Sequence, residues 1–258
     1  MAFASGLIGL LLGSFGNVLI HRVPRGESVV HPPSHCPKCL RPIRPGENIP
    51  VLSYLWLRGR CAGCGERISA RYPFIELASG LAFFLVVLVG GVSGTSVMVL
   101  VLLYFGFVLS AIDIEHHRLP DRLTLAFAVA VAMVAIGSGF AEGAWDPVVR
   151  ALIGGAALGL LYGLAFVVYP RGMGFGDVKL APTIGAVLAF IGWPELVVGA
   201  FAAFVWGALV GVAHMARRRQ ARGVGIPFGP WMFVGAATGL VVGRPLAEWY
   251  LALMGVAP

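Results

Sequence analysis

The chain has 258 residues, of which 58% are hydrophobic and only 12% are charged. Soluble globular domains carry about 25% charged residues, so this composition excludes an ordinary soluble domain and indicates a protein embedded in a lipid bilayer. The net charge of +7 does not indicate nucleic-acid binding, because the basic residues stand in a few short loops between apolar segments. That distribution is typical of the topology signals of membrane proteins.

Eight apolar segments are candidates for membrane-spanning helices, since a span needs roughly 20 apolar residues to cross the hydrocarbon core. We predict them at residues 2–20, 73–90, 95–112, 123–141, 147–169, 179–193, 195–215 and 228–254. The first could pass for a signal peptide, but it lacks a basic start and no small-residue cleavage site follows it, so we expect a retained helix. The sequence thus predicts an all-α polytopic membrane protein, in which small residues such as Gly154, Gly155, Gly159 and Gly163 let helices approach closely.

The basic residues predict the orientation of these helices. With the N-terminus outside, the cytoplasmic loops are 21–72, 113–122, 170–178 and 216–227. These loops and their borders hold all of the 19 Lys and Arg residues except Arg150 and Arg244, and basic residues resist translocation. Three regions follow: a first transmembrane helix at 1–20, a cytoplasmic four-Cys loop at 21–72, and a transmembrane bundle at 73–258.

All four cysteines lie in the predicted cytoplasmic loop, in the pattern C-x2-C-x21-C-x2-C formed by Cys36, Cys39, Cys61 and Cys64. Two such pairs bring four thiolates around one Zn²⁺, and Gly63 and Gly65 suit the tight turns that this requires. Two disulfides or four free thiols are the alternatives, and a reducing cytoplasm disfavours the disulfides. Four Cys ligands leave no open coordination position, so we predict a structural zinc site.

Two aspartates are candidates for catalysis. Asp113 ends a long apolar segment, where an ionised carboxylate costs several kcal/mol (roughly 2.5–3.5 on insertion scales). Asp177 stands in the sequence GFGDVKL (174–180), which opens the sixth predicted helix. The topology brings both to the cytoplasmic face at one membrane depth. The alternatives are an interfacial Asp113 and a helix-capping Asp177.

Two carboxylates at one depth in a poorly polar site cannot both ionise cheaply, so the pair shares a proton. That is the state an aspartyl protease needs. The ionised carboxylate takes a proton from the attacking water, and the protonated one stabilises the oxyanion that develops. His116 and His117 have no evident nucleophile beside them, and we interpret them as interfacial residues.

Several motifs, spread over nearly the whole chain, resemble those of the bacterial type IV prepilin peptidases, which are leader peptidases and N-methyltransferases of the GxGD aspartyl protease group. Besides the two Cys pairs, they are GSFGNVLIHRVPR (13–25), ENIPVLSY (47–54), RGRC (58–61), ISARYP (68–73) with Glu76, LPDRLT (119–124) after Asp113, GMGFGDVKL (172–180) and IPFGP (226–230).

The resemblance implies that Asp113 and Asp177 are catalytic and that the protein lies in the bacterial inner membrane. It implies prepilin or pseudopilin substrates, cleaved after a Gly on the cytoplasmic side and then N-methylated with S-adenosylmethionine, whose binding residues the sequence does not identify. The first aspartate could instead be Asp121, which follows Leu-Pro and looks like a helix cap; we favour Asp113.

Two other functions remain as alternatives. A proton-coupled transporter also uses membrane aspartates, but transporters usually show inverted repeats and interrupted helices near mid-membrane, and no repeat is evident. A membrane assembly factor could use the zinc loop to bind partners, with aspartates that only cap helices.

Overall fold

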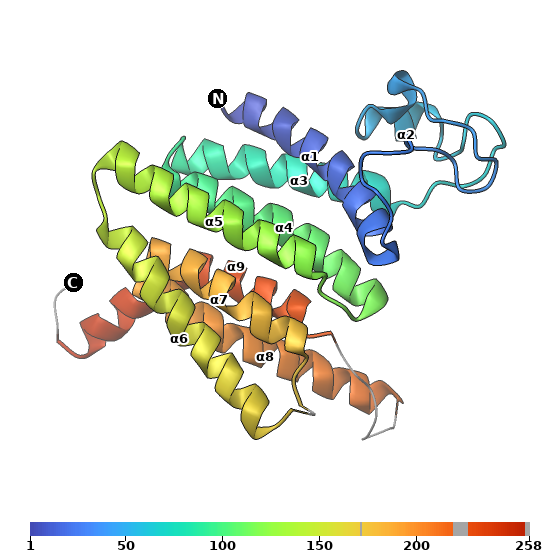
Figure 1. Cartoon of the computed structure of the whole chain (residues 1–258). Helices are drawn as coiled ribbons and strands as arrows, with labels where there is room; N and C mark the ends of the chain where they lie inside the picture. The colour runs from blue at the N-terminus through green and yellow to red at the C-terminus, as the bar shows by residue number, and fades with distance from the viewer. Residues whose placement is uncertain (171, 219–226, 256–258) are drawn as a thin grey trace. The chain divides into compact units, whose positions relative to one another are not determined.

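The computed structural model describes residues 1–170, 172–218 and 227–255, and within them the chain is almost entirely helical (Figure 1). The long helices are α1 (Ala2–Arg22), α3 (Arg71–Gly90), α4 (Gly94–His116), α5 (Asp121–Glu142), α6 (Asp146–Val168), α7 (Phe175–Ile191), α8 (Trp193–Arg218) and α9 (Gly229–Leu253). A short helix α2 (Leu52–Trp56) and two 3-10 turns, η1 (Val23–Arg25) and η2 (Pro45–Asn48), lie in the loop between α1 and α3.

The predicted fold class is confirmed, and each of the eight expected segments contains one long helix. By length and hydropathy, six of the described helices qualify as membrane spans: α1, α3, α4, α5, α6 and α8. Helix α7 has only 17 residues, and α9 carries Arg244 and Glu248. The count of eight spans therefore holds as an approximation.

The chain divides into two compact units, Met1–Ser96 and Val97–Pro258. In the first unit, α1 and α3 run antiparallel side by side (Figure 1). Small residues make this approach possible: a Cβ added at Gly9 would lie 2.6 Å from the Ser79 carbonyl oxygen, and one at Gly13 would lie 2.8 Å from the Glu76 Cα. The loop with α2 joins the ends of this helix pair.

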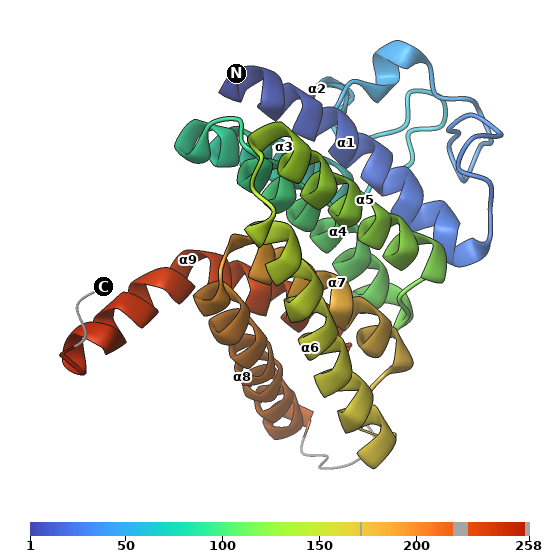
Figure 2. The same cartoon turned by 60° about the vertical axis from the view of Figure 1, so that its left-hand side comes forward.

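In the second unit, α7 is the central helix and contacts α5, α6, α8 and α9 (Figures 1 and 2). Most of its residues are buried, so α7 exposes little surface to lipid and can be shorter than the helices around it. Helix α4 is tied to this group by aromatic rings. Phe105 stacks on Phe127 of α5 with 5.0 Å between ring centroids, and Phe127 in turn contacts Phe233 of α9 at 6.1 Å.

Glycines predicted to serve close packing do so between α6 and α7. A Cβ at Gly154 would lie 2.2 Å from the Ala189 Cβ, and one at Gly159 would lie 2.8 Å from the Pro182 ring. Gly155 is similarly close to the Pro182 carbonyl oxygen. The prediction was wrong for Gly163, which has no described atom within 4 Å of its added Cβ.

The substitution Gly154→Ala should destabilise the second unit by about 1–3 kcal/mol, because the new methyl group forces α6 and α7 apart. Gly163→Ala adds the same group to the same helix without a clash and is the matched control. Thermal unfolding of the detergent-solubilised protein should show a lower Tm for Gly154→Ala only. Equal Tm values for both variants would contradict the tight contact.

The two basic residues outside the predicted cytoplasmic loops have local partners. Arg150 of α6 donates from Nε to the Ala189 carbonyl oxygen at 3.2 Å and from Nη2 to that of Phe190 at 3.0 Å. These carbonyls end α7, where a cation is favourable. Arg244 pairs with Glu248 one turn along α9. The predicted loop 216–227 lies largely outside the described residues.

Candidate functional site

Asp113 lies in the last turn of α4, and only 5% of it is exposed. Its Oδ2 accepts a hydrogen bond from the main-chain N–H of Gly229, at 3.1 Å, where α9 begins. A Cβ at Gly229 would lie 2.7 Å from that same oxygen. Glycine is thus the residue that lets the start of α9 approach the carboxylate this closely.

Asp177 lies in the first turn of α7 and is 6% exposed. The capping residue of α7 is Gly174, whose carbonyl oxygen accepts a hydrogen bond from the Asp177 main-chain N–H at 3.1 Å. Asp177 is the third residue of α7 and Gly174 is its cap, so the interpretation of Asp177 as the capping residue was wrong. The Asp177 carboxylate lies close to the start of the helix: a Cβ added at Gly174 would be 3.1 Å from its Oδ2.

The structure brings Asp113 and Asp177 together. The Leu119 side chain lies against two glycines: Gly176, which precedes Asp177, and Gly229, whose N–H donates to Asp113. A Cβ at Gly176 would lie 3.1 Å from the Leu119 Cβ, and one at Gly229 would lie 3.4 Å from its Cδ1. Two buried carboxylates from different helices therefore share one poorly solvated site.

Asp121, the alternative to Asp113, has a different environment. Its side chain is 77% exposed and forms an ion pair with Lys179. It is the first residue of α5, and the cap is Pro120, so the predicted capping role was displaced by one residue. Asp121 is therefore in contact with solvent and with a lysine, whereas Asp113 and Asp177 are buried.

Three features beside the aspartates were not assigned a role from the sequence. Gly229 belongs to the motif at 226–230, which was noted but not linked to Asp113; its first residue, Ile226, lies outside the described residues. Leu119 gave no signal beyond its place in the LPDRLT motif. The Tyr162 ring of α6 is 1% exposed and lies beside the ring of Phe228, the residue before Gly229. In the sequence, Tyr162 resembled one more apolar residue of a spanning segment.

The four cysteines of the first unit converge as predicted. All four are free thiols, and their sulfur atoms lie within 4.8 Å of one another. The Sγ atoms of Cys36 and Cys64 are 3.8 Å apart, and those of Cys39 and Cys61 are 4.0 Å apart. A tetrahedral zinc with Zn–S bonds of about 2.3 Å requires sulfur atoms roughly 3.8 Å apart, so the cluster fits Zn²⁺.

Each Cys pair sits in a small hairpin of the same design. The N–H of Cys36 donates to the Arg41 carbonyl oxygen and that of Cys61 to the Glu66 carbonyl oxygen, at 3.0 and 2.8 Å. The fourth residue after the first cysteine has a positive φ in both hairpins, 59° at Leu40 and 73° at Gly65. The expected turn role of Gly65 is confirmed.

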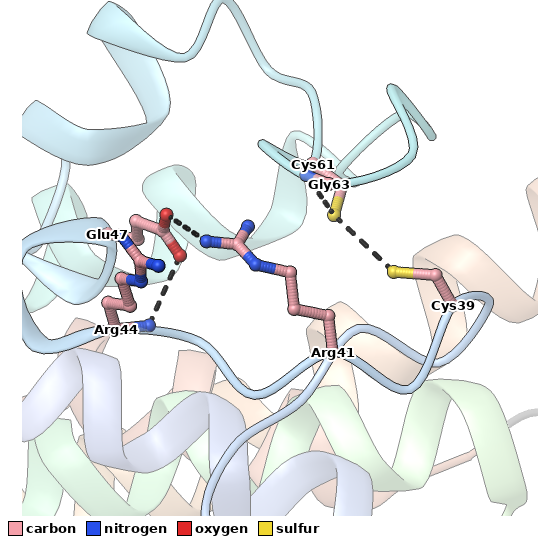
Figure 3. A network of polar contacts seen from close by, with 6 residues as sticks. All are labelled: Cys39, Arg41, Arg44, Glu47, Cys61 and Gly63. Atoms are coloured by element: carbon pink, nitrogen blue, oxygen red, sulfur yellow. Dashed lines mark hydrogen bonds and ion pairs between the residues drawn. The ribbon is translucent and has the colours of Figure 1, made fainter.

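Gly63 serves close contact rather than a left-handed turn. Its N–H donates to the Cys61 sulfur at 3.4 Å, and its added Cβ would lie 2.9 Å from the Arg41 Cδ. The Arg41 guanidinium donates to Glu47 at 2.7 Å, and the other Glu47 oxygen accepts from the Arg44 N–H at 3.1 Å (Figure 3). This network ties the first hairpin to the second and to η2.

The electrostatics of the cluster favour a bound cation. Hydrogen bonds from the main-chain N–H groups of Cys64 and Gly63 lower the pKa of Cys61 to about 6. The Glu66 main-chain N–H favours the Cys64 thiolate, but burial and the neighbouring cysteines outweigh it and raise the pKa of Cys64 to about 11. Four adjacent thiolates therefore need a divalent ion among them to ionise together.

Two family models match the chain, and the boundary between them falls where the two compact units meet. The model of the Bacterial Peptidase A24 N-terminal domain matches residues 7–89, and that of the Type IV leader peptidase family matches residues 100–212. A prepilin leader peptidase/N-methyltransferase of Aeromonas hydrophila is 34% identical over 95% of this chain and 92% of its own. The chain belongs to the type IV leader peptidase family. The Cys cluster lies in the first matched region, and both aspartates lie in the second.

Further relatives support this membership. The prepilin leader peptidase/N-methyltransferase of Pseudomonas aeruginosa is 33% identical over 96% of this chain and 93% of its own. That of Burkholderia pseudomallei is 35% identical over 99% and 88%. No solved structure matches the chain. A type IV leader peptidase with several apolar helices is a multi-pass protein of the bacterial inner membrane.

On the predicted catalytic role of Asp113, the substitution Gly229→Ala should lower leader cleavage by on the order of 10²-fold, because a displaced catalytic group costs that much for a shift of about 1 Å. The new methyl group would meet the Asp113 carboxylate at 2.7 Å, while the backbone N–H is kept. Gly137→Ala, on an open stretch of α5 with no described atom within 4 Å, is the control. Kinetics of leader cleavage measure the effect, and a Gly229→Ala enzyme as active as Gly137→Ala would contradict it.

Proposed function

We propose that the chain is an intramembrane aspartyl endopeptidase that removes the leader from prepilins or pseudopilins, with Asp113 and Asp177 as the catalytic pair. One observation carries the proposal: two carboxylates, 5% and 6% exposed, come from different helices and lie around the same Leu119 side chain. The membership of the chain in a family of leader peptidases supports the reaction class.

The chemistry follows from one proton held between the two carboxyl groups. The ionised carboxylate takes a proton from a water molecule as the water oxygen attacks the scissile carbonyl carbon, and the protonated carboxyl gives its proton to the carbonyl oxygen. The carbon–nitrogen bond then breaks, the leaving nitrogen takes up a proton, and the carboxyl pair regains its shared proton. One water is consumed for each bond cleaved.

The cytoplasmic face is the proposed side of cleavage. The loops that hold most of the basic residues fall on the side where α4 ends, at Asp113, and α7 begins, at Asp177, and basic loops stay in the cytoplasm. A short basic leader on a hydrophobic substrate helix stays on the same side for the same reason. The scissile bond between leader and helix then comes to the depth of the two carboxylates.

We propose that Cys36, Cys39, Cys61 and Cys64 hold a structural Zn²⁺. The sulfur spacing supports a tetrahedral site, and four thiolates fill it. The metal supplies a cross-link between the two hairpins, and this loop has little other regular structure to order it.

Methylation of the new N-terminus is the proposed second activity, since the relatives are named N-methyltransferases. S-adenosylmethionine is the methyl donor for such reactions. The amine nitrogen forms a bond to the methyl carbon, the carbon–sulfur bond breaks with its electron pair moving to sulfur, and the nitrogen releases a proton. Cleavage must come first, because it creates the amine.

Incubation of the detergent-solubilised protein with a prepilin, with and without S-adenosylmethionine, tests both activities. Mass spectrometry should detect a product that lacks the leader in both reactions, and a product heavier by one methyl group only with the methyl donor. An intact prepilin would contradict the peptidase proposal. A cleaved product that never gains a methyl group would contradict the methyltransferase proposal alone.

A further inference from the structure

The short helix α2 (Leu52–Trp56) presents an exposed apolar face in the loop between α1 and α3. Leu52, Leu55 and Trp56 are between 56% and 64% exposed, whereas Ser53 is buried. Residues three and four positions apart lie on the same side of a helix, so these three side chains form one surface, which we call the α2 face. Adjoining apolar side chains that stay exposed mark a contact with another protein or with a membrane.

A hydrogen bond holds the start of α2 against α3. The Val51 N–H, directly before α2, donates to a carboxylate oxygen of the buried Glu76 at 2.8 Å. Glu76 follows Arg71, the first residue of α3, by five positions, which places it about 7 Å along the helix. Because α3 is long and apolar enough to span a membrane, α2 is tied to the part of α3 that crosses from the headgroups into the hydrocarbon.

The surface of α3 is apolar and exposed at this level. Phe74 and Leu77, on either side of Glu76 in the sequence, are well exposed, as expected of side chains that face lipid. Arg71 and Tyr72 precede them, and basic and aromatic residues of this kind are typical of the membrane boundary. Lipid therefore surrounds α3 at the level of Glu76, and a helix held at that level meets the same lipid.

The charge beside the α2 face indicates the kind of lipid. Arg58 and Arg60 follow α2, both are exposed, and residues 49–60 include no Asp or Glu. The nearest acidic residues in the sequence, Glu47 and Glu66, already form ion pairs within the loop. The two arginines therefore leave a net positive charge next to the α2 face, and the cytoplasmic leaflet is rich in anionic headgroups.

We propose that the α2 face docks on the membrane surface, with its apolar side chains at the boundary between headgroups and hydrocarbon and the two arginines on anionic phosphates. Trp is enriched at this boundary, and an apolar face flanked by basic residues is typical of helices that lie in the interface. One helical turn is sufficient here, because α1 and α3 already hold both ends of the loop at the membrane. The contact keeps the four-Cys loop against the bilayer rather than free in the cytoplasm.

The hydrophobic helix of a substrate is the competing occupant of the α2 face. The proposed substrate has a basic leader, and like charges brought together disfavour binding, so Arg58 and Arg60 would repel that leader. The same arginines attract an anionic lipid surface. The charge therefore favours lipid.

Photo-cross-linking in lipid nanodiscs identifies what contacts the α2 face. Trp56→benzoylphenylalanine introduces a group that, under ultraviolet light, forms a covalent bond only with what it touches. In discs of equal parts phosphatidylcholine and phosphatidylglycerol, phospholipid should become attached at this position of the full-length protein, as detected by mass spectrometry. Leu40→benzoylphenylalanine is the matched control, because Leu40 is also well exposed in the same loop. We expect at least fivefold less attached lipid at position 40.

Two further changes separate the apolar and the charged parts of the contact. Leu55→Ser should lower the lipid yield at position 56 at least threefold, because the buried apolar area holds such a face in the interface. The attached lipid should include at least twice as much phosphatidylglycerol as phosphatidylcholine. The pair Arg58→Gln and Arg60→Gln should make the two lipids equal.

Several outcomes would overturn the membrane contact. Equal lipid yields at positions 56 and 40 would do so, and so would attachment of a second copy of the chain in place of lipid. Added prepilin should leave the lipid yield unchanged, and a prepilin attached at position 56 instead of lipid would assign the α2 face to the substrate. Equal amounts of the two lipids with Arg58 and Arg60 intact would overturn the preference for anionic headgroups.

Discussion

The variants Asp113→Asn and Asp177→Asn should each lower the rate of leader cleavage by roughly 10³-fold or more, because neither leaves a pair that can hold and transfer one proton. Asn has nearly the shape of Asp and cannot ionise, so the packing around Leu119 and Gly229 should persist. The double variant should be no slower than either single variant, because residues that act as a unit are strongly non-additive. Single-turnover cleavage of a prepilin in detergent measures all three rates.

The control for this prediction is Asp121→Asn. Asp121 is exposed and paired with Lys179, so its loss should change the rate by only a few-fold. An inactive Asp121→Asn together with an active Asp113→Asn would assign the first catalytic aspartate to Asp121. Continued cleavage by Asp177→Asn would end the two-aspartate mechanism.

The second large effect is expected at the metal site. Cys61→Ser should reduce bound zinc from about one per chain to nearly none, because the site loses one of four thiolate ligands. Structural zinc in small folds contributes about 10–16 kcal/mol to folding. The loop should therefore open, and Lys38, Arg60 and Arg67, none of which is followed by proline, should become rapid trypsin sites. Metal analysis of the purified protein and peptide mapping after brief digestion measure the two effects.

Ala62→Ser is the control for the zinc prediction, since it adds a hydroxyl between two ligands at an exposed position and keeps all four sulfur atoms. It should retain zinc and resist trypsin as the wild type does. Wild-type protein with no zinc and four readily alkylated thiols would contradict the metal site. The second unit should stay folded in Cys61→Ser, because its helices pack through their own contacts.

The helices were predictable because a bilayer requires long apolar segments with satisfied backbone groups. The Cys cluster was predictable because two C-x2-C pairs are the usual way in which a chain places four thiolates around one Zn²⁺. The sequence did not predict which helices pack against each other. The glycines of α1, such as Gly9 and Gly13, indicate that another helix approaches closely, but they do not identify α3 as that helix. From the sequence, the helix at 73–90 was placed with the bundle; in the structure, α3 and α1 lie in one compact unit.

For the candidate site, the sequence placed Asp113 and Asp177 at one membrane depth but did not indicate which residues surround them. Asp113 and Gly229 are 116 positions apart, and no local pattern connects a glycine N–H in one helix to a carboxylate in another. The helix boundary also shifted the capping role predicted for Asp121, since α5 begins at Asp121 with Pro120 as its cap. Such one-residue differences at helix ends are expected, because end residues have only part of the helical hydrogen bonding.

The small length of α7 bears on how a pilin must present itself. Seventeen residues extend about 26 Å, which is less than the roughly 30 Å of a typical hydrocarbon layer. Asp177 lies in the first turn of this short helix, so the proposed cleavage takes place at that end of α7, and a substrate has to offer its backbone there in extended form, because a helix hides its peptide bonds. A flexible glycine just before the cut lowers the energy of that unwinding, so residues that stiffen this junction should make a poor substrate even when the leader still docks.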